Sequence, residues 1–201
     1  MAIPRPNVVV IAGPNGAGKS TIAPDVLRGA MSVVEFVNAD WIAQGLSAFD
    51  PEGAAMAAGR IMLARLKELA EQQVSFAFET TLASRSFAPW IAKLRQSGYA
   101  FHLIYVWVPS PDVAIGRVAL RVSEGGHHVP EEVVRRRYGG GLRNFFELYQ
   151  PIADTWRCYD STVVVRPKIF ASGRGSHYER IYNKPKWKAF IKARDAAQTS
   201  P

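Results

Sequence analysis

Short apolar runs alternate along the chain with segments in which apolar residues recur at helical spacing. Val8–Ala12 is a continuous and mostly β-branched run, which is typical of a strand buried on both faces. Further strands are predicted at Val33–Val37, Val74–Phe78, Phe101–Val108 and Thr162–Val165. Because helical segments separate these runs, the pattern predicts an α/β fold with a parallel five-stranded sheet and helices on both faces.

Helical periodicity and capping residues mark the segments between the strands. Helices are expected at Ser20–Arg28, from Asp50-Pro51 onward, at Phe87–Gln96, from Ser110 to Gly125, from Pro130 to Gly139, at Leu142–Tyr149 and at Lys186–Ala196. Asp50 is a suitable N-cap, because proline follows it at the first helical position. The three glycines at 139–141 predict an interruption, and residues 172–176 are expected to form a loop.

A glycine-rich segment directly after the first strand matches the pattern G-x-x-x-x-G-K-[ST]. We assign to its nucleotide site Gly13, Pro14, Asn15, Gly16, Ala17, Gly18, Lys19, Ser20 and Thr21. Glycines let the backbone curl with its N–H groups toward phosphate oxygens, and the helix that follows adds its positive end. Lys19 would supply charge to the β- and γ-phosphates, and the Ser20 hydroxyl would join the shell of a Mg²⁺ ion. The motif therefore predicts ATP and Mg²⁺ as cofactors.

Such a loop serves motors, switches and small-molecule kinases alike, so other residues must separate these classes. Asp40 follows the second predicted strand, at the carboxyl end of the sheet where ligands bind in such folds. Its carboxylate could deprotonate an acceptor hydroxyl, or it could only cap the next helix. Glu79 and Thr81 follow the third strand. Glu79 could hold Mg²⁺ through water or bind substrate hydroxyls, and Thr81 could contact the acceptor; capping and turn formation are the alternative.

Arginines cluster in the segment that we expect to form a helical lid, at about residues 117–143. Arg117 and Arg121 are four residues apart and share one helix face. Arg135, Arg136 and Arg137 follow between two glycine-rich stretches, which suit a segment that closes over ATP. Solvated surface arginine is the alternative for at least two of these five.

The composition excludes several classes of protein. The 201 residues, 48% hydrophobic and 21% charged, fit one globular domain. The longest strongly apolar run, Leu103–Val108, is far shorter than the roughly 18 residues of a membrane span. We expect no membrane association and no secretory signal, and the single Cys158 fits a reducing cytoplasm.

The net charge of +8 is concentrated near the C-terminus. Residues 161–201 contain nine Lys or Arg and only Glu179 and Asp195 as acidic residues. We therefore divide the chain into a P-loop domain at 1–166 and a basic C-terminal extension at 167–201. The extension could bind nucleic acid, but a solvated terminal segment is the favoured interpretation.

The motifs in this order resemble the zeta toxin family of P-loop kinases. The resemblance rests on the loop at 13–20, Asn38-x-Asp40, Glu79-x-Thr81-Leu82, Arg121, and the Gly-Gly-His-x-Val-Pro stretch at 125–130. It extends over about residues 7–165, although the chain is short for these toxins.

The resemblance implies transfer of the ATP γ-phosphoryl group to the 3′-hydroxyl of the amino sugar in UDP-N-acetylglucosamine, and an antitoxin as a partner. It implies that Asp40 is the base, that Lys19 and Arg121 stabilise the transferring phosphoryl, and that Glu79 and Thr81 bind the acceptor. A second lid arginine is also implied; we assign it to Arg135, while Arg136 and Arg137 compete for the role.

Two other functions stay open at this point. One is a kinase for another hydroxyl, on a nucleoside, a dinucleotide or a polynucleotide end. The other is a nucleic-acid-binding ATPase that uses the basic C-terminal segment.

Overall fold

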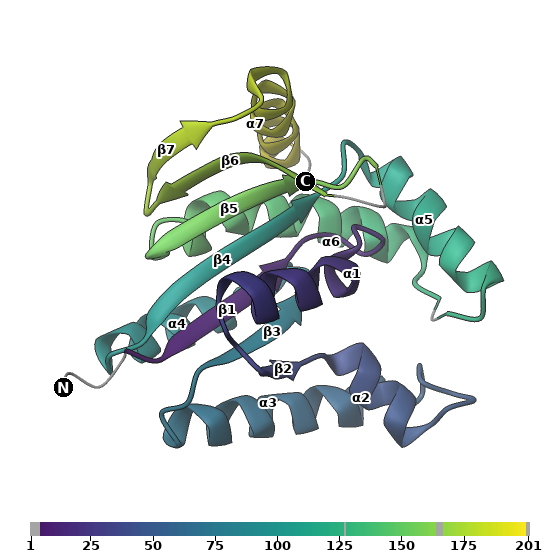
Figure 1. Cartoon of the computed structure of the whole chain (residues 1–201). Coiled ribbons are helices and arrows are strands. Elements are labelled where there is room, and N and C mark those ends of the chain that lie inside the picture. The colour runs from purple at the N-terminus through teal and green to yellow at the C-terminus, as the bar shows by residue number, and fades with distance from the viewer. Residues whose placement is uncertain (1–4, 127, 164–166, 200–201) are drawn as a thin grey trace.

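The computed structural model describes residues 5–126, 128–163 and 167–199. Within these ranges, seven strands form one sheet in the order β2-β3-β1-β4-β5-β6-β7 (Figure 1). The strands are β1 (Asn7–Ala12), β2 (Glu35–Val37), β3 (Phe76–Thr80), β4 (Ala100–Trp107), β5 (Thr155–Asp160), β6 (Lys168–Arg174) and β7 (His177–Ile181). The first five are parallel, whereas β6 and β7 are antiparallel to their neighbours.

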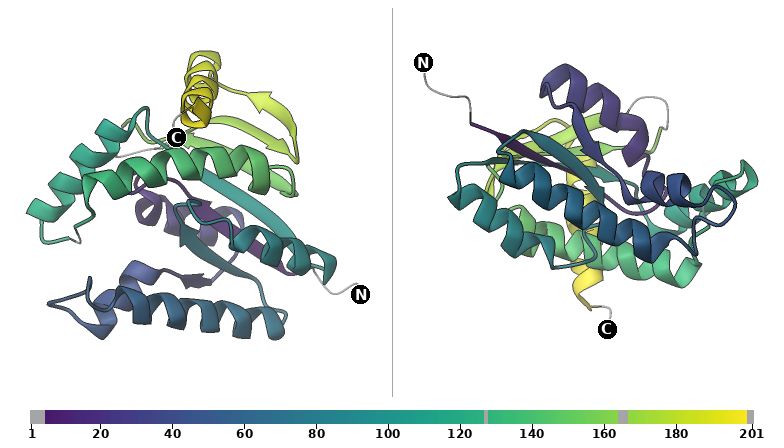
Figure 2. Two further views of the ribbon diagram at one scale, coloured as in Figure 1. Left: turned by 180° about the vertical axis from the view of Figure 1, so that it is seen from behind. Right: turned by 90° about the horizontal axis from the view of Figure 1, so that it is seen from below.

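Helices cover both faces of this sheet. They are α1 (Lys19–Pro24), which continues as the π-helix η1 (Asp25–Ala30), α2 (Ala39–Leu46), α3 (Ala55–Glu71), α4 (Phe87–Gln96), α5 (Pro111–Ser123), α6 (Glu131–Asn144), the π-helix η2 (Phe145–Tyr149) and α7 (Lys184–Thr199). Figure 1 shows α1 in front of the strands, and the view from behind in Figure 2 shows α4 and α6 on the opposite face. No helix of the described residues is long and apolar enough to cross a membrane.

The centre of the sheet explains the position of the phosphate loop. Val8–Ala12 in β1 are fully buried, as the continuous apolar run predicts, because β3 and β4 flank the strand and helices cover both faces. Ala12 lies beside Thr80 of β3 and Tyr105 of β4. β1 and β3 therefore end level with each other, while β4 continues to Trp107, and the loop that follows β1 lies next to the carboxyl end of β3 that carries Glu79.

The prediction of a wholly parallel five-stranded sheet is wrong in two respects. The sheet is mixed and has seven strands among the described residues. The fifth parallel strand is Thr155–Asp160, whereas Thr162 and Val163 form a bend, and 164–165 lie outside the described residues. This strand is not a continuous apolar run, because the exposed Arg157 lies between the buried Trp156 and Cys158.

The basic C-terminal segment packs into the same body. Residues 172–174, expected as a loop, belong to β6, which pairs with β5. Phe190 of α7 is fully buried, and its ring lies 5.5–5.6 Å from the rings of Tyr105, Trp107 and Phe145. Main-chain pairing and apolar packing therefore continue past residue 166. A boundary between residues 166 and 167 could separate two functions, but it would not separate two folding units.

The helix α6 runs without interruption through Gly139, Gly140 and Gly141. The predicted break is wrong because a glycine inside a helix can also allow close packing without ending the helix. A Cβ atom at Gly141 would overlap the carbonyl oxygen of Thr81, so the absent side chain lets α6 approach the loop after β3.

Candidate active site

The phosphate loop connects β1 to α1 and comprises residues 13–18. Gly13, Gly16 and Gly18 have φ angles of 142°, 75° and 81°, a region that L-residues avoid. A side chain at Gly13 would also overlap the carbonyl oxygen of Val106 in β4. The loop therefore needs glycine both for its curl and for its close approach to the sheet.

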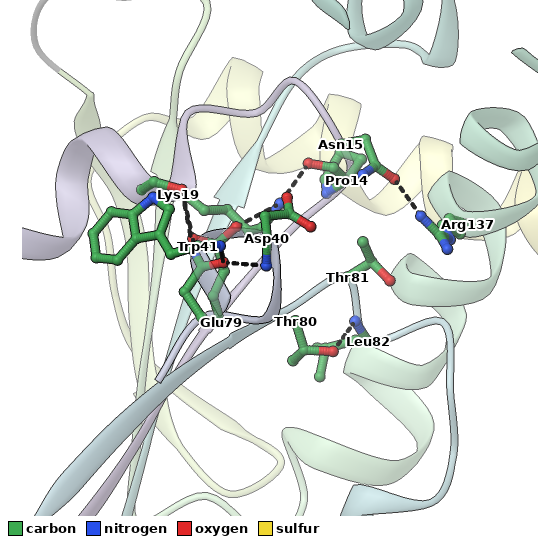
Figure 3. A network of polar contacts seen from close by, with 12 residues as sticks. Pro14, Asn15, Lys19, Asp40, Trp41, Glu79, Thr80, Thr81, Leu82 and Arg137 are labelled. Carbon is green, nitrogen blue, oxygen red and sulfur yellow. Dashed lines mark hydrogen bonds and ion pairs between the residues drawn. The ribbon is translucent and has the colours of Figure 1, made fainter. Parts of the chain in front are cut away.

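Lys19 is buried at the start of α1 and reaches across the loop. Its Nζ donates to Pro14 O at 3.0 Å and lies 3.4 Å from Glu79 Oε1, with 7% of the lysine side chain exposed. The ammonium group is thus held between the loop and the carboxyl end of β3 (Figure 3). Thr21 is exposed in the same first turn of α1.

A polar cluster joins α1, β3 and the segment after β2. Ser20 Oγ donates to Glu79 Oε2 at 2.7 Å, and Asn38 Nδ2 donates to the same oxygen at 2.9 Å. These contacts place the Glu79 carboxylate beside Ser20 and Lys19, which are predicted to bind metal and phosphate. Of the two roles open for Glu79, the geometry therefore favours the metal over the acceptor hydroxyl.

Asn38, which precedes Asp40 by two residues, caps the helix α2. Asn38 Oδ1 accepts hydrogen bonds from the backbone N–H groups of Asp40 at 2.8 Å and Trp41 at 3.3 Å, so Asn38 is the N-cap of α2. The alternative in which Asp40 caps this helix is therefore wrong. The exposed side chain of Asp40 instead lines a cavity of about 300 Å³. The cavity is also lined by Lys19, Asn38, Glu79, Thr81 and Arg137.

The loop after β3 forms the floor of this cavity and has an unusual backbone. Leu82 is fully buried with a φ of 58°, a left-handed conformation that costs energy for a residue with a side chain. Thr81 Oγ1 accepts from Ala83 N at 3.4 Å, so Thr81 both forms the turn and lines the cavity. From α6, Asn144 Nδ2 donates to Leu82 O at 2.7 Å, and this helix thereby holds the loop in place.

Among the lid arginines, Arg137 points into the cavity (Figure 3). Its Nη1 donates to Asn15 Oδ1 of the phosphate loop at 3.4 Å. Burial lowers the pKa of the Arg137 guanidinium, Asp40 opposes this effect, and Arg136 adds to it. Arg135, in contrast, pairs with Asp112 at 2.7 Å and lies outside the cavity lining.

Arg117 and Arg121, the two arginines on α5, also lie outside this lining, as does Arg136 on α6. Arg117 donates to Ser161 O at 2.6 Å and to Thr162 O at 3.0 Å, which ties α5 to the segment after β5. Arg121 is in the last turn of α5, where its side chain packs so closely on Gly126 that a Cβ there would overlap it. The structure thus brings together Lys19, Asp40, Glu79 and Thr81 but not Arg121 or Arg135.

Sequence reasoning missed Asn38 as the helix cap and preferred Arg135 to Arg137. Both signals were present in the chain. Asparagine is a preferred N-cap, and Asn38 stands between a strand and a helix. The helical period that joins the buried Val134, Tyr138 and Gly141 places Arg137 on the inward side of α6 and Arg135 on the outward side.

Comparison with known proteins gives a family and a fold. Residues 8–139 match the AAA domain family designated AAA_33. An uncharacterized protein of Haemophilus influenzae is 28% identical over 130 residues, which cover 65% of this chain and 91% of that protein.

Two solved structures share the fold at low identity. A chain of the AvrRxo1-ORF1:AvrRxo1-ORF2 complex with sulphate ions is 17% identical, with a TM-score of 0.76 over 98% of this chain. Our chain spans only 65% of that chain. A structure from the PezAT chromosomal toxin-antitoxin system of Streptococcus pneumoniae is 14% identical, with a TM-score of 0.63 over 100% of this chain and 90% of that one. Since the AAA_33 match includes the phosphate loop and most of the sheet, the protein belongs to this family of AAA domains, with the α/β fold of P-loop kinases.

Proposed function

We propose that the protein is an ATP-dependent phosphotransferase that acts on a hydroxyl group of a small molecule. The observation that carries the proposal is the convergence on one cavity of about 300 Å³ of Lys19, Asp40, Glu79 and Arg137. A phosphoryl-transfer site needs cations at the phosphates, a metal ligand and a base for the acceptor hydroxyl. These four side chains, with Ser20, supply each of those groups.

Ser20 and Glu79 would hold Mg²⁺. A hydroxyl and a carboxylate 2.7 Å apart are hard oxygen donors, and Mg²⁺ is commonly bound by one or two such groups together with phosphate oxygens and water. When bound, the ion would neutralise charge on the transferring phosphoryl. Asn38 donates to Glu79 and so orients this carboxylate toward Ser20.

Asp40 would be the general base, and the cavity between Asp40, Thr81 and Arg137 would accept the hydroxyl substrate. Lys19 and the loop residues 13–18 would bind the β- and γ-phosphates, with Arg137 as the cation on the acceptor side. Arg121 lies outside this lining, so its proposed contact with the transferring phosphoryl requires a movement of the lid.

The nucleotide sugar UDP-N-acetylglucosamine, phosphorylated at its 3′-hydroxyl, is our proposed acceptor. The proposal rests on the zeta toxin resemblance, and the shared fold of the PezAT structure supports it. ATP as donor is supported by the phosphate loop and by a similar AvrRxo1-ORF1:-ORF2 structure with ATP, at a TM-score of 0.74 and 17% identity. A protein antitoxin is the proposed partner, in keeping with the toxin-antitoxin system to which the PezAT structure belongs.

Transfer from γ-labelled ATP into a metabolite extract, with the product identified by mass, tests this function. We expect label in UDP-N-acetylglucosamine, and Asp40→Asn should slow transfer by about 10²–10⁴-fold while ATP affinity stays unchanged. Label in another metabolite would keep the kinase and overturn the acceptor. ATP hydrolysis without any labelled product, or hydrolysis that requires DNA, would overturn the kinase.

A matched pair of arginine variants tests the assignment on α6. Arg137→Ala should reduce the rate by about 10³-fold or more, as loss of an arginine at a transferring phosphoryl does. Arg135→Ala removes the same charge two residues away and should change the rate less than about threefold, because its salt bridge with Asp112 is exposed and outside the cavity. The reverse ranking would show that α6 faces the phosphates with its other side.

A further inference from the structure

A second cavity, of about 520 Å³, lies on the side of α6 that faces α7 and the start of α5. We call it the α6–α7 groove, and its lining includes Pro111, Arg136, Gly139, Gly140, Arg143 and Ala197. It shares no lining residue with the cavity at the phosphate loop. Figure 2 shows α7 against α6 in the view from behind. The volume is in the range of small-molecule sites, roughly 300–1,000 Å³.

Two of the three arginines that line the groove, Arg136 and Arg143, have no salt bridge within the described part of the chain. Arg136 and Arg143 are seven residues apart, so they lie two helical turns apart on one face of α6. In the described part of the chain, neither arginine has a carboxylate within 4 Å, whereas the neighbouring Arg135 pairs with Asp112 at 2.7 Å. The Cα atoms of Arg136 and Arg143 are about 10 Å apart along the helix axis, a spacing that two long arginine side chains can span to bind one phosphate group from both sides.

Three consecutive glycines of α6, at 139–141, lie between Arg136 and Arg143. Glycine inside a helix lowers its stability relative to alanine, so each such residue needs a reason. Gly141 has one, since a Cβ there would overlap Thr81 O. A Cβ at Gly139 would have as its nearest neighbour Ala197 Cβ of α7 at 3.7 Å, an ordinary packing distance, whereas one at Gly140 would meet Ala83 in the loop after β3 at 3.8 Å and so would not point into the groove. Packing therefore does not require Gly139, and the absence of a side chain there keeps the groove open between Arg136 and Arg143.

The remaining walls are apolar. Proline and alanine side chains from the start of α5 and from α7 complete the groove, among them Pro111, Ala193, Ala196 and Ala197. A cavity with apolar walls and a few placed cations suits a ligand that has an anionic head and an apolar body. Arginine binds phosphate oxygens through paired N–H donors, and a phosphate has enough oxygens to accept from two arginines at once, so a phosphate group suits this pair.

We propose that the α6–α7 groove is a second ligand site, separate from the phosphate loop, which binds a small organic phosphomonoester between Arg136 and Arg143. The phosphate lies against the guanidinium groups, and the apolar body lies over Gly139 and Gly140 against the alanines of α7.

Phenyl phosphate is a suitable probe, titrated into ¹⁵N-labelled protein whose phosphate loop is filled with Mg²⁺ and a non-hydrolysable ATP analogue. We expect saturable shifts at the amides of Gly139, Gly140 and Ala197. Inorganic phosphate should bind more weakly at the same amides, and phenol should cause no saturable shift. Shifts confined to residues 13–20, or no saturation with phenyl phosphate, would overturn the proposal.

Variants then locate the site. The double variant Arg136→Ala/Arg143→Ala should weaken phenyl phosphate at least about tenfold, the effect of losing charge-assisted hydrogen bonds. The control Arg28→Ala/Arg60→Ala removes two exposed arginines elsewhere and should leave affinity within about twofold. Gly139→Ala should weaken binding while the melting temperature does not fall. An equal loss in the control, or full affinity in Gly139→Ala, would show that the groove is not the site.

Discussion

Replacing Gly141 with alanine tests how α6 positions the candidate acceptor loop. The added Cβ would overlap Thr81 O, and apolar carbon atoms need about 3.5 Å from their neighbours. Helix and loop must therefore separate by about 1 Å. Asn144 is one turn further along α6 and holds Leu82 O at 2.7 Å, so this hydrogen bond should lengthen or break.

The energy of this change follows from opposing effects. Alanine in a helix is favoured over glycine by about 0.5–1 kcal/mol. Overpacking costs about 1–3 kcal/mol, and the weakened hydrogen bond adds about 1 kcal/mol. Gly59→Ala in α3 is the matched control, because a Cβ there has no neighbour within 4 Å. Gly141→Ala should be less stable than this control by about 2–4 kcal/mol, which corresponds to a melting temperature lower by about 4–16 °C.

The kinetic effect separates a positioning role from a merely structural one. A displacement of about 1 Å in a loop that lines the acceptor cavity should lower kcat/KM for the acceptor by about 10²-fold. ATP affinity should stay unchanged, because the nearest neighbours of a Cβ at Gly141 belong to Thr81 and Ala83 and not to the phosphate loop. The assays are thermal unfolding, ATP titration and phosphoryl transfer on both variants. If Gly141→Ala matched Gly59→Ala in melting temperature and turnover, the close approach of α6 to Thr81 would be refuted.

Three further predictions concern the frame around the site. Removal of residues 167–201 should unfold the domain, because it takes Phe190 out of the core, and a truncated chain that melts like the full-length protein would contradict this. Phe190→Ala alone should lower the free energy of unfolding by about 3–5 kcal/mol, as measured by chemical denaturation. The pKa of Asp154 is lowered. Partial burial raises this pKa, but the hydrogen bonds from Arg95 and from a backbone N–H lower it by a larger amount. Its stabilisation is therefore present at neutral pH and lost as pH falls below about 4, so Asp154→Asn should cost about 1–2 kcal/mol at pH 7 and less at pH 3 in urea titrations at both values. Burial raises the pKa of the Cys158 thiol, so iodoacetamide should modify it only in denaturant, and rapid labelling of folded protein would argue against its buried position.

Much of the fold could be predicted where the signal is local. The limits of α4 and the apolar run of β1 agree with the sequence, and Ser110 caps α5 as the Ser-Pro-Asp segment indicates. Each depends on neighbours within a few residues or on burial so complete that no polar residue interrupts the run.

Prediction failed where a residue's role depends on a partner distant in sequence. The polar–apolar alternation in β5 becomes a strand by pairing with β4 and β6, and the basic segment after residue 166 is structural because Phe190 reaches the core. The helix interruption expected at 139–141 did not occur, since Gly141 lies against Thr81, 60 residues earlier in the chain.

The sequence by itself determined the phosphate loop, and it indicated Asp40, Glu79 and Thr81 as candidates because each follows a strand of a sheet whose carboxyl ends meet. Only the tertiary structure decided that Glu79 lies at Ser20, since this contact depends on the register of β1 and β3. It also decided that Arg137 faces the cavity and Arg135 does not. Adjacent arginines are chemically identical in a sequence, and the direction of each is set by which face of α6 packs on the sheet.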